Sequence, residues 1–548
     1  WHTQRPPYPD ASTGYYGPII EDHNNAEIVN QYLVRYLWNA GADVWTVRER
    51  DLNSFKHIVD DGTPGFEAAG AWGTVHDAGY GQEYLQAFTA PGGGASATWT
   101  LGPVAADGSY ALYVWYAHGS DRTTDAAYTV YHAGGSTDFR LDQRYHGYTW
   151  RYVGRFPVRA GEYLTVRLSN ASAVSGRVVV ADAVRLGGGR FEDGDLRTNG
   201  GPVQTDAPYA PDRSWWEVSA YYQVQRLGLN PNQFSYFNDI VARPFWARWE
   251  HIDSGEDAVY VSWHSNGYNG HNTTLWGTVS YIHSFQPVPG SAELRDAIHN
   301  ELINDIRAGW DADWQDLGKA SRDLGELREL WDENPPNGLP GALIEVAYHD
   351  HVGNADALKD PRFALLSARA VYQGIVRYFG RDLPLLPEPP THLTLRNDGP
   401  GQLRVSWRPS PTDDAGLLGD AATSYRIYTS HDGLGWDNGR PVAGTETLLT
   451  GLGRNELIFV RVTGVNAGGE SFPTPTLAGR ASGNGMAQIL IVDGFDRIDR
   501  HGLPLEDDPD EGWNARLFPE RINRYDYVIE HARYITLPFD SAMNEAVR

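Results

Sequence analysis

Ala258-Val-Tyr-Val-Ser-Trp-His264-Ser-Asn266 is a short apolar run that ends in polar side chains, and Gly341-Ala-Leu-Ile-Glu345 repeats this pattern further along the chain. Such runs are typical of strands buried in an α/β sheet. Ligands and catalytic groups collect at the carboxyl ends of these strands. A histidine and a glutamate in these positions, with an acidic candidate near the start of the chain, predict a metal-dependent hydrolase.

The composition limits the classes of protein to which the chain can belong. Its 548 residues predict roughly three or four domains of about 150 residues each. No apolar run approaches the ~20 residues that a bilayer span needs. The net charge of −25 argues against a nucleic-acid binder and fits an exported protein kept soluble by its charge. Because the chain has no cysteine, any metal must be held by His, Asp or Glu.

The pattern of apolar residues divides the first part of the chain into three segments. Residues 1–61 and 189–381 have α/β character, whereas short alternating runs between Gly, Asp and Asn turns predict a β-sandwich over 62–188. Helices are expected over 24–38, 215–227, 292–306 and 363–379, and a strand is expected over 43–48. The sandwich is therefore predicted to interrupt a single α/β domain.

The remainder of the chain begins with a proline-rich stretch over 382–390, which predicts an extended, semi-rigid linker. Residues 391–482 have the size and strand spacing of a seven-stranded sandwich. Residues 486–548 have the pattern of the first βα unit of another domain. Both ends look trimmed, so the sequence is expected to be a processed or partial form of a longer exported protein.

Four motifs follow one another in the α/β parts: Glu21-Asp-His-Asn-Asn25-Ala-Glu-Ile, Gly41-Ala-Asp-Val44-Trp-Thr46-Val-Arg48, Arg243 upstream of Ser262-Trp-His264-Ser-Asn266, and Leu343-Ile-Glu345 with Asn354 and Asp356 downstream. In this order they resemble the zinc-dependent N-acetylmuramoyl-L-alanine amidases, which cut the glycan strand of peptidoglycan from its stem peptide. The resemblance implies that Glu21 and His264 are zinc ligands and that Glu345 is the general base. It also implies that Arg243 and Asn266 bind substrate.

The resemblance departs from the family at the third zinc ligand, which is a histidine in a Gly-His-Gly-type turn. This turn has no counterpart here, so the strand and its histidine are expected to precede residue 1, with His2 as a candidate substitute. A catalytic zinc ion takes three protein ligands and keeps a fourth position for water, whose pKa it lowers to about 7. Glu345 would take the proton of that water and return it to the leaving amine.

Structural roles compete with each of these assignments. Glu21 lies where acidic residues favour a helix N-terminus, and His264 and Glu345 could be polar residues satisfied at strand ends. Tyr348-His-Asp-His351 could form a small metal site of its own. Surface or supporting positions are expected for the remaining histidines of interest, which are His23, His271, His283, His349 and His351.

The inserted block carries Glu67-Ala-Ala-Gly-Ala-Trp72, Gly108-Ser-Tyr-Ala-Leu-Tyr-Val-Trp115, Trp150-Arg-Tyr-Val-Gly154 and Val180-Ala-Asp-Ala-Val184. These motifs resemble the golvesin C-terminal or xanthan-lyase-associated carbohydrate-binding module. The 391–482 segment is similar to a fibronectin type III domain, and 486–548 to the partial start of a flavodoxin-like domain. Asn170-Ala-Ser172 and Asn272-Thr-Thr274 are candidate glycosylation sequons.

Three functional hypotheses follow. The first is an extracellular or cell-surface zinc amidase that acts on peptidoglycan or another glycan. The second is a non-catalytic surface or filament protein, built on an amidase scaffold with an incomplete metal site and assembling with its own copies. The third is a polysaccharide-degrading enzyme, which rests only on the association of modules.

Overall fold

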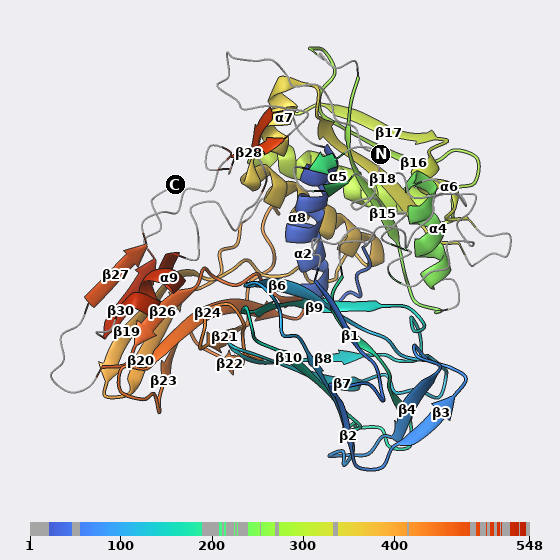
Figure 1. The fold of residues 1–548 in the computed structure, drawn as a ribbon. Coiled ribbons are helices and arrows are strands. Elements are labelled where there is room, and N and C mark those ends of the chain that lie inside the picture. The colour runs from blue at the N-terminus through green and yellow to red at the C-terminus, as the bar shows by residue number, and fades with distance from the viewer. Residues whose placement is uncertain are drawn as a thin grey trace.

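The structure is a computed structural model, and it shows an α/β domain and two β-sandwiches that contact one another (Figure 1). It describes residues 21–46, 55–188, 208–210, 213–214, 224, 227, 239–251, 254–268, 273–331, 338–413, 416–482, 489–493, 500, 503, 505–508, 512–515, 517, 527–535 and 538–543. Among the described helices, none is both long enough and apolar enough to cross a bilayer.

The α/β domain is built on a four-stranded sheet of order β15-β18-β16-β17. β15 runs parallel to β18, β16 antiparallel to β18, and β17 parallel to β16. Its strands are β15 (Tyr260–Asn266), β16 (Thr278–His283), β17 (Asp316–Arg322) and β18 (Gly341–Tyr348). Its helices are α1 (Glu21–Ile28), η1 (Val29–Leu33), α2 (Val34–Asn39), α4 (Asp239–His251), α5 (Ser291–Gly309), α6 (Gly325–Arg328), α7 (Val352–Leu358) and α8 (Pro361–Phe379). A short hairpin, β13 (Pro208–Ala210) with β14 (Arg213–Ser214), precedes α4.

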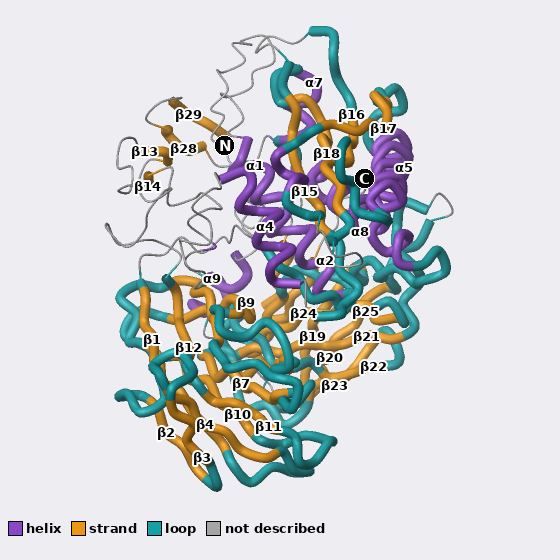
Figure 2. The backbone as a smooth tube through the Cα atoms, turned by 90° about the vertical axis from the view of Figure 1, so that its right-hand side faces the viewer, coloured by secondary structure: helices purple, strands orange, loops and turns teal. Residues whose placement is uncertain are grey.

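Helices cover both faces of this sheet, which explains why β18 is an almost continuous apolar run (Figure 2). Successive side chains of a strand point to opposite faces. Ile344 accordingly packs in the core formed with α1, η1, α5 and α8, whereas Leu343 packs with residues of α6 in a second core. Three of the expected helices are confirmed, as α1–α2, α5 and α8. The helix expected over 215–227 lies largely outside the described residues.

The strand expected over 43–48 is not formed over its described part, 43–46, which pairs with no strand of the described residues. β-structure requires a partner strand, and β15 pairs only with β18 within the described chain. The segment instead lies along a cavity beside β15.

The inserted block is a β-sandwich with three sheets around one core, of order β1-β12-β6-β9, β2-β5-β10-β7-β8 and β11-β4-β3. The strands are β1 (Lys56–Val59), β2 (Phe66–Ala69), β3 (Gly73–His76), β4 (Glu83–Phe88), β5 (Ser96–Leu101), β6 (Gly108–Val114), β7 (Ala126–His132), β8 (Gly135–Leu141), β9 (Arg151–Val158), β10 (Leu164–Ser169), β11 (Val178–Ala181) and β12 (Val184–Gly187). Because β1 pairs with β12, the sandwich begins at residue 56, earlier than the expected residue 62.

The second sandwich has one sheet of order β22-β21-β24-β25, with β26 also on β24, and one of order β23-β20-β19-β30-β27. Its elements are β19 (Thr391–Gly399), β20 (Gln402–Arg408), β21 (Ser424–Ser430), β22 (Arg440–Val442), β23 (Glu446–Leu449), β24 (Leu457–Asn466), β25 (Gly469–Glu470) and β26 (Leu477–Arg480). The elements after it are β27 (Ile489–Asp493), β28 (Leu505–Asp508), β29 (Gly512–Ala515), α9 (Tyr527–Tyr534) and β30 (Phe539–Met543). Residues 486–548 were expected to begin a separate, flavodoxin-like α/β unit. β27 and β30 pair in parallel, but β30 also pairs with β19, so in the described residues they extend the sheet of the second sandwich.

The proline-rich segment is not a free spacer, which corrects the expectation from its composition. Leu385 and Leu386 are buried in the core of the α/β domain. The backbone N–H of Leu386 donates to the hydroxyl of Tyr372 on α8 at 3.0 Å, and Arg369 pairs with Glu388 at 2.9 Å. Apolar burial at the two leucines therefore docks the segment onto the α/β domain.

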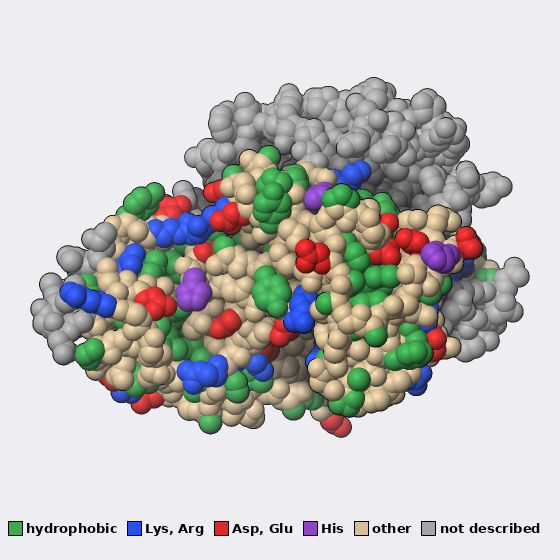
Figure 3. Space-filling model, turned by 60° about the horizontal axis from the view of Figure 1, so that its bottom comes forward, with side chains coloured by type: hydrophobic (Ala, Val, Ile, Leu, Met, Phe, Trp, Pro, Cys, Tyr) green, Lys and Arg blue, Asp and Glu red, His purple; other side chains and the backbone are tan. Residues whose placement is uncertain are grey.

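The two sandwiches also touch each other. The Thr137 hydroxyl donates to the Trp436 carbonyl at 2.9 Å, and the Asp138 backbone N–H donates to Asn438 Oδ1 at 2.7 Å. On the face shown in Figure 3, acidic and basic side chains of the described residues are interspersed rather than segregated by sign. Polar contacts thus join the insertion to the second sandwich.

A buried ionic cluster fastens the insertion to the α/β domain. His146 Nδ1 lies 3.2 Å from Glu250 Oε1, and His146 Nε2 lies 2.7 Å from Glu256 Oε2. Arg151 of the insertion also pairs with Asp43. Burial alone would lower the pKa of His146, but the hydrogen bonds with both glutamates raise it to about 9. His146 is therefore an imidazolium that bridges two carboxylates at neutral pH.

This cluster predicts that the stability of the junction depends on pH. Because the folded-state pKa of His146 exceeds the ordinary value of 6.5, its stabilising contribution is complete below pH 6.5 and is lost as the pH rises through about 9. We expect the Tm of the insertion to fall over that interval in the native chain and to fall less in His146→Gln. His431→Gln, at an exposed position, is the matched control. Identical pH profiles for native protein and His146→Gln would contradict the assignment.

Candidate functional site

The pairing of β15 with β18 brings together the two residues that the sequence singled out. His264 and Glu345 are Cα partners in this parallel ladder, near the carboxyl ends of both strands. Two residues at equal register on neighbouring strands point to the same face of the sheet. The structure therefore sets a histidine and a carboxylate side by side, although 80 residues separate them in the sequence.

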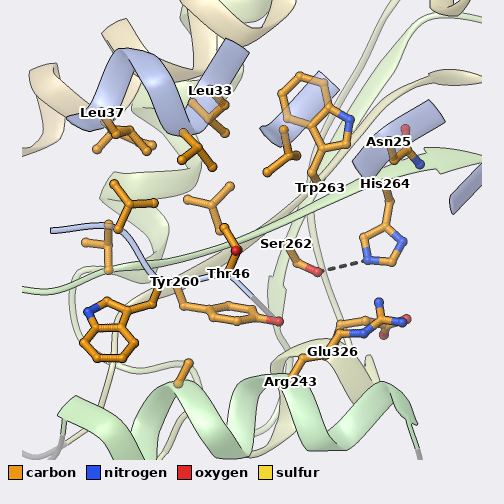
Figure 4. A pocket seen from close by; sticks show the side chains of 18 of the residues that line it. Asn25, Leu33, Leu37, Thr46, Arg243, Tyr260, Ser262, Trp263, His264 and Glu326 are labelled. Atoms are coloured by element: carbon orange, nitrogen blue, oxygen red, sulfur yellow. Dashed lines mark hydrogen bonds between the residues drawn. The ribbon is translucent and has the colours of Figure 1, made fainter. Parts of the chain in front are cut away.

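Both residues line a cavity of about 830 Å³ that runs along the outer edge of β15. Side chains from both faces of β15 reach it, including Val261 and Trp263 from one face and Tyr260 and Ser262 from the other. α1 and α2 form one wall, and α4 forms another, as Figure 4 shows. The site is thus a deep hollow beside the edge strand.

The environment of His264 keeps its imidazole neutral. Ser262 lies two residues earlier on the same face, and its hydroxyl is 2.9 Å from His264 Nε2 (Figure 4). Burial lowers the pKa of His264, and the positive charge of Arg243 lowers it further, to about 3. A neutral imidazole is the form that binds a metal ion.

The remaining predicted site residues fall into two groups. Arg243, on α4, and Asn266, at the end of β15, line the same cavity as His264 and Glu345. Glu21 is the first residue of α1, but its side chain lies outside the described residues, as do His2 and Asn272. The structure therefore brings four of the predicted residues into one cavity and leaves the proposed Glu21 contact untested.

Asn170 is not available as a glycosylation site in the folded chain, which corrects the sequon assignment. Its side chain is 8% exposed. Its Nδ2 donates to the Phe88 carbonyl at 2.8 Å, and its Oδ1 accepts from the Ala95 N–H at 2.8 Å. A glycan on this amide would disrupt its hydrogen bonds and would have to be accommodated at a buried position.

Among the other histidines, His349 was expected in a surface or supporting role, but it is buried and lines the cavity. Its Nδ1 lies 3.1 Å from the Ser265 carbonyl oxygen. His351 instead caps α7, and His283 lies 3.1 Å from Asp323 Oδ1. His23 and His271 lie outside the described side chains. The separate contacts of His349 and His351 do not support a metal site in Tyr348-His-Asp-His351.

The described side chains contain two groups of three metal-competent residues whose ligand atoms lie within 4.8 Å of one another. One consists of His146, His251 and Glu256 at the junction, and the other of Asp60, Asp61 and Asp182 in the insertion. His264 belongs to neither group. Sequence analysis missed both, because each joins residues that only the folded chain brings together.

Asn354 fixes the end of the strand that carries Glu345. Its side chain is 1% exposed, and its Oδ1 accepts from the backbone N–H of Gly277 at 2.8 Å and of Tyr348 at 3.1 Å. One amide oxygen thus ties β18 to the loop before β16 and supports the geometry of the site.

We expect Asn354→Ala to lower the free energy of unfolding by about 2 kcal/mol or more, because two buried N–H groups lose their acceptor. Asn300→Ala, on the exposed side of α5, should change it by no more than about 0.5 kcal/mol. Urea denaturation followed by tryptophan fluorescence measures both. Equal values for the two variants would show that Asn354 does not anchor the strand.

Comparison with known proteins places the insertion in a family. Residues 57–188 match the golvesin C-terminal domain. A xanthan lyase from Bacillus sp. (strain GL1) is 36% identical over 135 residues, which cover 24% of this chain and 14% of the lyase. An uncharacterized cell wall amidase from Bacillus anthracis is 27% identical over 135 residues, which cover 24% of this chain and 23% of that protein.

A solved structure, the CwlD amidase from Clostridioides difficile in complex with the GerS lipoprotein, is 22% identical, with 28% of this chain and 68% of that chain covered and a TM-score of 0.21. The chain spans less than a quarter of either curated relative. The protein has several domains and is rich in β-sheet. It contains a golvesin C-terminal domain, and over 135 residues its sequence is similar to that of a protein named as a cell wall amidase.

Proposed function

We propose that the α/β domain is a zinc-dependent amidase that hydrolyses the bond between N-acetylmuramic acid and L-alanine in peptidoglycan. The register of β15 and β18 carries this proposal, because it sets His264 beside Glu345 in a cavity. The partial similarity to a protein named as a cell wall amidase supports the substrate class. A substrate in the cell wall would place the protein outside the cell or on its surface.

The donor types at this site fit zinc. His264 is held neutral by burial, as a zinc ligand must be. Glu21 would be a second ligand, and the cavity beside β15 leaves room for a third, which the described side chains do not supply around His264. When bound, zinc would supply a water molecule of pKa about 7 and polarise the scissile carbonyl.

The chain's own residues would then perform the proton transfers. Glu345 would accept a proton from the attacking water and deliver it to the leaving amine nitrogen of L-alanine. Arg243 and Asn266, which line the cavity from α4 and β15, would bind polar groups of the substrate. The insertion would hold the enzyme on glycan strands, a role supported by its match to the golvesin C-terminal domain and by the partial similarity of the chain to a xanthan lyase.

The second hypothesis, a non-catalytic surface protein that assembles with its own copies, has one observation in its favour. Within the described side chains, His264 does not belong to any group of three metal-competent residues. Zinc that bound without any turnover would support this alternative.

The proposal predicts that the chain, supplied with zinc, releases stem peptides with a free L-alanine amino terminus from purified peptidoglycan, detected by mass spectrometry. Glu345→Gln should lower the rate on the order of 100-fold or more, because it removes the general base while preserving shape. Glu293→Gln, at an exposed position in the first turn of α5, should leave the rate unchanged. No release by the native chain, or equal rates for the two variants, would contradict the proposal.

A further inference from the structure

A second candidate site lies in the insertion, remote from β15. Asp60 and Asp61 follow β1, and Asp182 joins β11 to β12. One carboxylate oxygen from each lies within 4.8 Å of the other two. The antiparallel pairing of β1 with β12 brings the two segments together. Asp61 is only 6% exposed and Asp182 only 1%.

The negative charge of this cluster has no cationic partner among the described ion pairs, none of which includes Asp60, Asp61 or Asp182. Among the described residues, the Asp182 carboxylate accepts hydrogen bonds only from the backbone N–H of Tyr80, at 3.1 and 3.3 Å to its two oxygens. Asp61 Oδ1 is buried and accepts no hydrogen bond from the part of the chain that the structure describes. A buried, unsatisfied carboxylate oxygen beside two further carboxylates is costly unless a cation compensates it.

The titration behaviour agrees with this charge imbalance. Burial is the largest cause that raises the pKa of Asp61 to about 7, and repulsion from Asp60 and Glu83 adds to it. Burial also raises the pKa of Asp182 to about 8. Without a cation, the cluster must therefore hold protons near neutral pH.

We propose that Asp60, Asp61 and Asp182 bind a calcium ion. All the side-chain donors are carboxylate oxygens, which Ca²⁺ prefers, whereas zinc favours nitrogen and sulfur. The loop opposite is built from glycines that let the backbone come close. A Cβ at Gly81 would lie 2.1 Å from Asp60 Oδ2, and one at Gly79 would lie 2.9 Å from Asp182 Oδ2.

The ion would also order an aromatic cluster. The Asp182 carboxylate accepts a hydrogen bond from the backbone N–H of Tyr80. The centroid of the Tyr80 ring lies 5.5 Å from that of Trp115 and 5.0 Å from that of Trp150. In addition, Trp99 Nε1 donates to the Asp182 carbonyl at 2.9 Å. These rings would sensitise the luminescence of Tb³⁺, which stands in for Ca²⁺ at oxygen sites.

The test uses the full chain and two readouts that are independent of activity. We expect tryptophan-sensitised Tb³⁺ luminescence that CaCl₂ displaces, and a higher Tm of the insertion in millimolar CaCl₂ than in EDTA. Asp61→Asn and Asp182→Asn should each weaken Tb³⁺ binding on the order of tenfold or more, because ligand charge sets the affinity of such sites. Asp121→Asn, whose carboxylate is exposed and paired with Arg122, should bind as the native chain does.

The Asn variants also separate a lost ion site from a misfolded sandwich. In EDTA, Asp61→Asn should have a Tm equal to or above that of the native chain, since it removes a buried charge, and calcium should no longer raise it. The proposal is overturned if the native chain shows neither Tb³⁺ luminescence nor a calcium-dependent Tm. It is also overturned if Asp61→Asn and Asp182→Asn retain both responses.

Discussion

Parallel hydrogen bonding between β15 and β18 is the interaction on which the candidate site depends. It places His264 level with Glu345, and it requires both strands to be apolar enough for burial between two helical layers. Moving β15 by one residue would turn His264 to the opposite face, because strand side chains alternate. The hydrogen bond from the Tyr348 N–H to Asn354 and the burial of Ile344 in the core shared with α5 and α8 hold β18 in place. The register of β15 against β18 therefore determines which side chains meet at the candidate site.

The insertion and the second sandwich are fixed to this domain by different interactions. Ionic contacts at His146 and Arg151 join the insertion, and apolar burial of Leu385 and Leu386 docks the segment before the second sandwich. His251 and Glu256 belong to the junction and also line the cavity of His264. The golvesin-type insertion therefore adjoins the candidate active site, an arrangement suited to a module that holds a polymeric substrate beside a catalytic domain.

The sequence predicted those features that depend on local pattern. The apolar runs before His264 and Glu345 identified two strands, and helical periodicity identified α5 and α8. The sequence pattern could not show that residues 43–46 have no partner strand among the described residues or that Asn170 is buried, since both depend on packing. The same holds for Asp182 beside Asp60 and for His146 beside Glu250, because more than a hundred residues separate each pair. The burial of the two leucines in the proline-rich segment was also not predicted, because the composition of a segment does not show whether it packs against a neighbouring domain.

The proposed zinc site contains His264 and lies beside Glu345. His251 and Glu256, which form a second metal-competent group with His146, line the same cavity as His264, so the total zinc content does not show which residues hold the ion. Anomalous diffraction at the zinc absorption edge, from crystals grown with zinc, locates the ion directly. We expect an anomalous peak within bonding distance of a His264 ring nitrogen and adjacent to the Glu345 carboxylate. A peak only at His146, His251 and Glu256, with none beside His264, would contradict it.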